Sequence, residues 1–334
     1  MNICVYGAGA VGGSIAARLH ASGENVSVIA RGAHAEAIRE RGLTVVTGDS
    51  RIDARVRLAS DPSELGPQDL VIVTVKGHQL PAIAQPLGRM LDSGAHAVFA
   101  MNGILWWFAD GLPLGLPAAF ADALDPGGEL RRCIAPDRII GAVVNSSNEV
   151  IEPGMILNTT PQRNRLILGA AHGASAPAAA AVATVAALFA RAGYDAPVTP
   201  DIRQALWNKL ALYTGVAPMA ALTHRDLGTL LADPSAYAMM AGLMRETIAI
   251  GRRLGFSYQG EVDTDLGFFR GKATRPSMLQ DFELGRAPEL AGSILAVEAI
   301  AQALDIDAPR IEMVATLLRL KAANPGRAIP SRAL

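Results

Sequence analysis

Three glycines near the start of the chain are spaced for binding phosphate groups. Gly7, Gly9 and Gly12 form the pattern G-x-G-x-x-G between a strand-like run over residues 3–6 and a helix-like run over residues 14–21. The first glycine permits a tight turn, the second lets the backbone approach a pyrophosphate, and the third lets helix and strand pack closely. We therefore expect a dinucleotide site at the N-terminus of this helix, rather than an ordinary tight turn. Its predicted residues are Gly7, Gly9, Ala10, Val11 and Gly12.

Arg31 occupies the position that selects between the two nicotinamide dinucleotides. It follows the strand-like run over residues 26–30, nineteen residues after Gly12. NAD-binding versions of this arrangement carry an acidic residue there, which holds the ribose 2′-hydroxyl, whereas no Asp or Glu stands at that corner of this chain. A guanidinium can bind a 2′-phosphate through two hydrogen bonds. The sequence therefore favours NADPH, the alternative being an arginine that is merely exposed to solvent.

Two polar residues follow the next two buried strands. Lys76 comes after the apolar run over residues 70–75, and Asn102 comes after the run over residues 97–101. The carboxyl ends of parallel strands form the ligand-binding edge of an open sheet, so both side chains are candidates for that edge. Each also has an ordinary interpretation, as a lysine that reaches out to water and as part of an Asn-Gly turn.

Lys209, Ser277 and Glu289 could carry acid–base chemistry in the second half of the chain. Lys209 lies in a helix-like segment among apolar neighbours, and Ser277 and Glu289 each begin a predicted helix. A lysine enclosed in a cleft can have its pKa lowered to roughly 7–8, which suits a proton donor. The carboxylate could hold that ammonium, and the hydroxyl could bind a substrate carboxylate. The alternatives are a surface lysine, a helix cap and a charge that favours the helix dipole.

The elements that must position these residues alternate between strand and helix in the first half, which predicts a parallel sheet. Strands are predicted over residues 3–6, 26–30, 43–46, 52–58, 70–75 and 97–101, and helices over residues 14–21, 33–41 and 79–91. The runs 43–46 and 52–58 are expected to pair with each other. The Gly- and Pro-rich residues 109–137 are expected to form an irregular insertion.

Three further β-like runs, over residues 139–144, 150–157 and 165–168, predict an antiparallel extension at the sheet edge. A helix over residues 176–192 and a short strand over residues 196–198 close this half. Beyond residue 199 only helical patterns remain. They cover residues 202–216, 234–254, 277–284, 290–304 and 310–323.

We therefore expect an α/β protein in two domains. Residues 1–199 are predicted to form a Rossmann-like, doubly wound NADPH-binding domain with the antiparallel extension. Residues 200–334 are predicted to form an all-α substrate domain that carries the catalytic residues. A cofactor at the carboxyl edge of the sheet would face this helical domain across a cleft.

The composition argues against a nucleic-acid-binding protein and against a membrane-spanning one. The 334 residues are 50% hydrophobic and 18% charged, with a formal net charge of −1, which allows a large core and argues against a nucleic-acid partner. The longest apolar run, residues 176–190, is too short to span a membrane. Cys4 and Cys133 offer no disulfide framework, so we expect a cytoplasmic protein. The histidines show no metal-ligand spacing, so we expect no metal. The chain starts on a strand, so we expect no signal peptide. The helical half offers apolar faces for a homodimer.

Together these motifs resemble the ketopantoate reductase (2-dehydropantoate 2-reductase) family over nearly the whole chain. The matching pieces, in order and spacing, are GAGAVG at 7–12, Arg31, T-V-K at 74–76, N-G at 102–103, D-I-R-x-x-L-W-x-K-L at 201–210, P-S-M-L-Q-D at 276–281 and Glu289. The resemblance implies an NADP-dependent oxidoreductase that reduces 2-dehydropantoate, a 2-keto acid, to pantoate in pantothenate biosynthesis. It also implies that Arg31 and Lys76 contact the phosphates and the ribose region of NADPH.

The resemblance further implies roles in catalysis and substrate binding. Lys209 would be the general acid, and Glu289 would complete the catalytic pair while also binding the substrate. Ser277 would bind the keto acid, and Asn102 would contact both the keto acid and the cofactor.

Two positions depart from the family pattern. On the helix that carries Lys209, the family usually has asparagines four and eight residues later, on roughly the same face, whereas this chain has Tyr213 and Ala217. We therefore expect Tyr213 to contact the substrate in a pocket of lower polarity. The alternative within the same class is a reductase of a larger or less polar keto compound. The alternative in another class is a non-catalytic NADPH-binding sensor.

Overall fold

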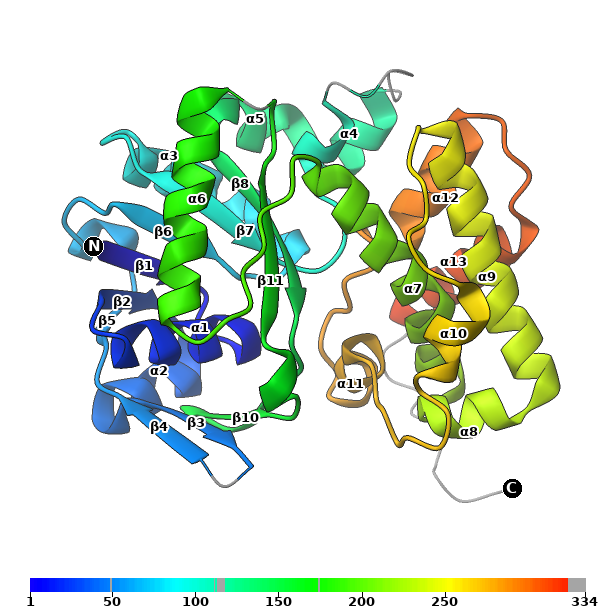
Figure 1. The fold of residues 1–334 in the computed structure, drawn as a ribbon, viewed down its shortest axis with the longest axis horizontal. Coiled ribbons are helices and arrows are strands. Elements are labelled where there is room, and N and C mark those ends of the chain that lie inside the picture. The colour runs from blue at the N-terminus through cyan, green and yellow to red at the C-terminus, as the bar shows by residue number, and fades with distance from the viewer. Residues whose placement is uncertain (49, 111, 113–117, 174, 324–334) are drawn as a thin grey trace. The chain divides into compact units, whose positions relative to one another are not determined.

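Strands of the first half of the chain form one seven-stranded sheet (Figure 1). The computed structural model describes residues 1–48, 50–110, 112, 118–173 and 175–323. The strands lie in the order β11-β8-β7-β6-β1-β2-β5. Their bounds are β1 (Asn2–Tyr6), β2 (Asn25–Ile29), β5 (Arg57–Ala59), β6 (Leu70–Val73), β7 (His96–Ala100), β8 (Ile139–Asn145) and β11 (Arg165–Ala170). Neighbouring strands pair in parallel except β11, which is antiparallel to β8, so the predicted doubly wound sheet with an antiparallel edge is confirmed.

Helices α1 (Ala10–Ala21) and α6 (Ala176–Arg191) share one apolar core with this sheet. Ile15 from α1 and Phe189 from α6 are buried in the same cluster as Val5 of strand β1. Strands buried on both faces carry continuous apolar runs, which is why the sequence revealed them. Three other helices of this part of the chain are α2 (Gly32–Arg41), α3 (Leu80–Leu91) and α5 (Glu129–Cys133).

A second sheet, with four strands in the order β4-β3-β10-β9, was not expected from the sequence. Its bounds are β3 (Leu43–Thr47), β4 (Ser50–Ala54), β9 (Asn148–Glu152) and β10 (Met155–Asn158). The prediction for residues 150–157 was wrong, because this run forms a hairpin around Gly154, at a φ of +81°, and β10 pairs in parallel with β3. The run 52–58 is also two strands, since β4 pairs with β3 as expected but β5 joins the main sheet beside β2.

Two further expectations for the first half need correction. The segment 109–137 contains helices α4 (Ala118–Leu124) and α5, so its described part is not wholly irregular. Helix α5 forms because the buried Asp125 carboxylate accepts hydrogen bonds from the Leu130 and Arg131 N–H groups, at 2.9 and 3.0 Å. Residues 196–198 form no strand, and this region makes only isolated bridges to β11.

The chain divides into two units by its internal contacts. The first comprises Met1–Asn102, Trp106–Asp110 and Asp125–Ala205, and the second comprises Gly103–Leu105, α4 and the residues from Leu206 onward. The remaining helices are α7 (Ile202–Thr223), α8 (Leu227–Ala232), α9 (Pro234–Arg253), α10 (Val262–Gly267), α11 (Ser277–Glu283), α12 (Ile294–Ala303) and α13 (Pro309–Ala323). None of the helices in the described part of the chain is long and apolar enough to cross a membrane.

Glu289 does not begin a helix, contrary to the prediction, because α12 starts only at Ile294. The intervening Gly292 carbonyl accepts a hydrogen bond from the Ile104 N–H at 2.7 Å. A Cβ on Gly292 would lie 2.7 Å from the Ile104 carbonyl oxygen, so the two backbones touch. This contact holds the chain in an irregular path before α12 and leaves Glu289 on a loop.

Candidate active site

The glycine loop joins β1 to α1 through a turn that only glycines can form. Gly7 has a φ of +99°, a conformation that side chains with a Cβ rarely adopt. A Cβ on Gly12 would lie 2.0 Å from the Gly7 carbonyl oxygen and 2.2 Å from the Thr74 Oγ1 atom. Helix α1 begins at Ala10, four residues before the predicted start, so Gly12 already lies in its first turns. The turn and the close helix–strand approach are two of the three features that the motif predicted.

The N-terminus of α1 fits the pyrophosphate of a dinucleotide. Gly9 precedes the helix, provides no side chain to cap its N–H groups, and is exposed. Among the described residues, no atom lies within 4 Å of the point where a Cβ on Gly9 would stand. No acidic residue occupies the first turn, so nothing there repels an anion. Open space, free donors and the helix dipole are the properties that an anion site at a helix N-terminus needs.

Thr74 holds the glycine loop in place from the neighbouring strand. Its Oγ1 hydroxyl donates to the Gly7 carbonyl at 2.5 Å and lies 3.3 Å from the Tyr6 carbonyl oxygen. Strand β6, which Thr74 follows, pairs directly with β1. Thr74 is a positioning residue that the sequence analysis did not single out, although its place beside Lys76 at a strand end was a usable signal.

The predicted NADPH residues lie at the carboxyl ends of three strands of one sheet. Arg31 follows β2, is exposed, and occupies the position just before α2. Burial raises the pKa of the Tyr6 hydroxyl, and the Arg31 guanidinium, which is hydrogen-bonded to that hydroxyl, acts in the opposite direction. Lys76 follows β6 and Asn102 follows β7, and both are partly buried. Since β1, β2, β6 and β7 are parallel neighbours, these residues share the sheet edge that carries the glycine loop.

The helical unit gathers the predicted acid–base and substrate residues into one cluster, except Asn102, which belongs to the first unit. Lys209 and Tyr213 are one turn apart on α7, Ser277 is the first residue of α11, and Glu289 lies on the loop before α12. The Glu289 carboxylate acts electrostatically on both Lys209 and Tyr213, and Tyr213 is hydrogen-bonded to Ser277. We call these four residues, Lys209, Tyr213, Ser277 and Glu289, the lysine cluster.

Loss of water changes the pKa of the two residues that the lysine cluster has on α7, Lys209 and Tyr213. The removal of water lowers the pKa of Lys209 to about 8, and the Glu289 carboxylate partly opposes this shift by favouring the ammonium. Loss of water also raises the pKa of Tyr213. The Glu289 carboxylate raises this pKa further, and the hydrogen bond to Ser277 lowers it in part. Near neutral pH, therefore, Lys209 can release and regain a proton, whereas Tyr213 keeps its hydroxyl hydrogen.

Two residues of α7 fix the helix so that Lys209 faces the cluster. The Trp207 indole N–H donates to the Thr247 carbonyl on α9 at 3.2 Å, and the Thr214 and Thr247 hydroxyls are hydrogen-bonded at 2.8 Å. A Cβ on Gly251 would stand 2.0 Å from the Trp207 Nε1 atom, so only glycine lets the indole pack against α9. Trp207 precedes Lys209 by two residues, which puts the two side chains on opposite sides of the helix.

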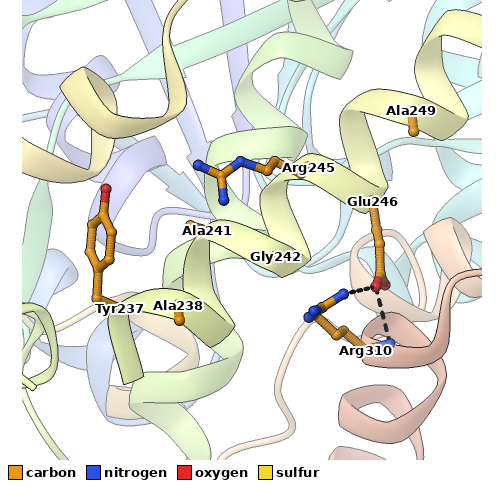
Figure 2. A pocket seen from close by; sticks show the side chains of 8 residues that line it. All are labelled: Tyr237, Ala238, Ala241, Gly242, Arg245, Glu246, Ala249 and Arg310. Atoms are coloured by element: carbon orange, nitrogen blue, oxygen red, sulfur yellow. Dashed lines mark hydrogen bonds and ion pairs between the residues drawn. The ribbon is translucent and has the colours of Figure 1, made fainter. Parts of the chain in front are cut away.

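A separate hollow of about 520 Å³ lies along α9 and the start of α13 (Figure 2). Figure 2 shows Glu246 and Arg310 pointing toward one another, with Arg245 and Tyr237 nearer the start of α9. The Glu246 carboxylate accepts from the Arg310 guanidinium at 3.0 Å and from the Arg310 backbone N–H at 3.3 Å. None of the lysine cluster lines this hollow, so it is not the predicted substrate site.

Comparisons with known proteins cover both units. The family model for ketopantoate reductase PanE/ApbA matches residues 3–171, and the model for its C-terminal part matches residues 201–322. The chain is 35% identical to a 2-dehydropantoate 2-reductase of Mesorhizobium japonicum, over 98% of this chain and 99% of the relative. A crystal structure of 2-dehydropantoate 2-reductase from Geobacter metallireducens matches with a TM-score of 0.83 and 29% identity, over 96% of this chain and 99% of that one. A PanE/ApbA family ketopantoate reductase structure from Ralstonia eutropha matches with a TM-score of 0.82 and 26% identity, over 98% and 100%.

Proposed function

This chain belongs to the ketopantoate reductase family, whose members are NADP-dependent oxidoreductases, and we propose that it reduces a 2-keto acid to the 2-hydroxy acid with NADPH. The first substrate to test is 2-dehydropantoate, the keto acid in the names of its curated relatives. The observation that carries the proposal is the lysine cluster, because it joins a lysine whose pKa is about 8 to a carboxylate and a serine on separate elements.

Three members of the lysine cluster, together with Asn102, have roles that their chemistry suits. NADPH, when bound, supplies the hydride that adds to the keto carbon. The Lys209 ammonium donates a proton from Nζ to the keto oxygen, which would otherwise become a charged alkoxide. The Glu289 carboxylate favours the ammonium form of Lys209 and can accept a hydrogen bond from the substrate. Ser277 can donate its hydroxyl hydrogen to the substrate carboxylate, and Asn102 can bind either the substrate or the cofactor.

The residues proposed to hold NADPH come from the first unit. Gly7, Gly9, Ala10, Val11 and Gly12 supply the turn and the N–H groups for the pyrophosphate. Arg31 is proposed to bind the 2′-phosphate, and Lys76 the ribose region. The exposure of Arg31 at the end of β2 supports this assignment, because an exposed guanidinium at a strand end can meet a ligand from solvent.

Tyr213 favours a second candidate function, the reduction of a less polar keto acid. Its hydroxyl is bonded to Ser277, and Ala217, two turns after Lys209, is buried and has no polar side-chain atom. A substrate hydroxyl that lacks a partner in a desolvated site loses roughly 1–3 kcal/mol, about 5- to 150-fold in catalytic efficiency. We therefore expect 2-dehydropantoate to be a poorer substrate than an analogue without its 4-hydroxyl.

One substrate pair tests both candidate functions. The compound 3,3-dimethyl-2-oxobutanoate is 2-dehydropantoate without the 4-hydroxyl group, so the ratio of the two kcat/KM values isolates that group. Reduction is followed as loss of the nicotinamide absorbance of NADPH. A ratio that favours 2-dehydropantoate rejects the second candidate. In the Tyr213→Asn variant, which restores an amide at this position, the ratio should shift toward 2-dehydropantoate.

A sensor without catalytic activity would bind NADPH and reduce neither compound, nor any other member of a 2-keto acid panel. We further propose that the protein works in the cytoplasm, where the NADPH pool is available and its free cysteines, Cys4 and Cys133, stay reduced. A homodimer stays a prediction, which size-exclusion chromatography with light scattering would test.

A further inference from the structure

His34 links the glycine loop to the hairpin between β9 and β10. It lies near the start of α2 and is partly buried. Its Nε2 atom is 2.6 Å from the Ala8 carbonyl oxygen, in the middle of the glycine loop. Its Nδ1 atom is 3.0 Å from the Gly154 backbone nitrogen, at the tip of the hairpin. One side chain therefore joins two segments that are 146 residues apart in the chain.

These two contacts determine the tautomer of the imidazole. The Gly154 N–H can only donate, so Nδ1 must accept and carries no proton. The Ala8 carbonyl can only accept, so Nε2 must carry the hydrogen. Burial also lowers the pKa of His34, an effect that the Ala8 carbonyl partly opposes, and this favours the neutral ring that both contacts require.

The hairpin that holds His34 is itself anchored. The Gly154 carbonyl accepts from the Thr44 N–H on β3 at 2.9 Å, and the Pro153 carbonyl accepts from the Arg41 guanidinium at 3.2 Å. A Cβ on Gly154 would stand 3.3 Å from the Ala37 Cβ atom on α2, so the hairpin tip packs closely against the helix. The anchored Gly154 N–H therefore holds the His34 ring at Nδ1, on the side opposite its contact with the glycine loop.

The bond to Ala8 sets the direction of one particular N–H group. In a trans peptide the C=O and the following N–H point in opposite directions. Because His34 holds the Ala8 carbonyl, the N–H of Gly9 must point away from His34. Thr74 holds the preceding carbonyl, that of Gly7, at 2.5 Å, so two consecutive peptide planes of the loop are fixed by side chains.

We propose that His34 is a positioning residue for the dinucleotide, which it serves by holding the Ala8–Gly9 peptide so that the Gly9 N–H is presented to the pyrophosphate. The inference rests on the proposed function only in that a dinucleotide is the ligand of the loop. His34 does not touch the reacting atoms, so it should affect the affinity for NADPH and leave the chemical step unchanged.

Two conservative substitutions separate the two contacts of His34. In His34→Gln the amide nitrogen can take the place of Nε2 and keep the bond to Ala8. In His34→Asn the amide oxygen can take the place of Nδ1 and keep the bond to Gly154, but the side chain is too short to reach Ala8. Glu36→Gln, an exposed position on the same helix, is the matched control.

The test measures the Kd of NADPH by fluorescence titration without substrate, the Tm of the free protein, and kcat at saturating NADPH. The expected result is an unchanged Kd for His34→Gln and Glu36→Gln, and a Kd raised about three- to tenfold for His34→Asn, as for the loss of one hydrogen bond. The kcat at saturation should stay the same in all of them. If His34→Asn does not fold, His34→Leu, which removes both hydrogen bonds, replaces it with the same expectation.

The inference is overturned if His34→Asn binds NADPH as tightly as the parent, or if both histidine variants lose affinity equally. A parent protein that binds NADPH but reduces no keto acid contradicts the proposed function and leaves the His34 result valid. A parent that binds no nicotinamide dinucleotide overturns both.

Discussion

If Lys209 is the proton donor, keto acid reduction should fall as the pH rises through about 8, the pKa of its partly buried side chain. The protonated form is the active one, so the rate is full below this pKa and declines above it. A group with this pKa is about 90% protonated at pH 7 and about 10% protonated at pH 9, which predicts a loss of about tenfold in kcat/KM between these two values. An ordinary exposed lysine would stay protonated throughout this range and give no loss.

The substitution Glu289→Gln should move this decline to lower pH. The Glu289 carboxylate raises the pKa of Lys209 against the larger effect of burial, so its removal leaves burial unopposed. The assay is the pH profile of kcat/KM from pH 6 to pH 10 at saturating NADPH, followed by nicotinamide absorbance. The substitution should also weaken substrate binding and so lower kcat/KM at every pH. The midpoint of the decline can still be compared, because it does not depend on the maximum value of kcat/KM.

The matched control is Glu312→Gln, which removes an exposed carboxylate on α13 and should leave the midpoint where it is. A parent decline that begins only near pH 10 would refute the assignment of Lys209 as a buried donor. A midpoint that rises in Glu289→Gln, or stays unchanged, would refute the electrostatic link between the two residues.

Three further predictions concern Lys209, Arg31 and the glycine loop. Lys209→Ala should lower kcat by about 10²- to 10⁴-fold, as expected for the loss of a general acid, while a fluorescence titration finds nearly unchanged NADPH affinity. Arg31→Asp should weaken NADPH binding by about 10- to 100-fold and improve NADH binding, whereas equal affinity of the parent for both cofactors would contradict the role of Arg31. Gly12→Ala should lower the free energy of unfolding, measured in urea, by about 1–3 kcal/mol or more, because its Cβ would stand 2.0 Å from the Gly7 carbonyl oxygen. The control is Gly9→Ala, which should unfold like the parent because its Cβ would meet no described atom within 4 Å.

The local patterns of the sequence were sufficient for most strands of the first unit's main sheet, although not for β5. The glycine motif and the apolar runs identified β1, β2, β6 and β7, because strands buried on both faces carry their signal within a few residues. The end of each strand also placed Arg31, Lys76 and Asn102 at one sheet edge. These inferences need no knowledge of distant residues, since parallel strands align their carboxyl ends.

Strand partners could not be obtained in the same way. Strand β10 pairs with β3, more than one hundred residues earlier in the chain, and the runs 52–58 and 150–157 each divide between two elements. A β-pattern reports that a segment is extended and half-buried, and carries no information on which strand lies beside it. The loop at Glu289 is a similar case, because its path depends on the contact between Gly292 and Ile104.

For the site, the sequence supplied the residue types and the tertiary structure supplied their properties. Motifs identified all four residues of the lysine cluster. A motif does not show how much water a lysine loses on folding, or that the Tyr213 hydroxyl is hydrogen-bonded to Ser277. The lowered pKa of Lys209 and the bond between Tyr213 and Ser277 arise only when α7, α11 and the loop before α12 come together. The electrostatic properties of a buried group are set by the water it loses and the charges it meets, and both are decided by residues far away in the chain.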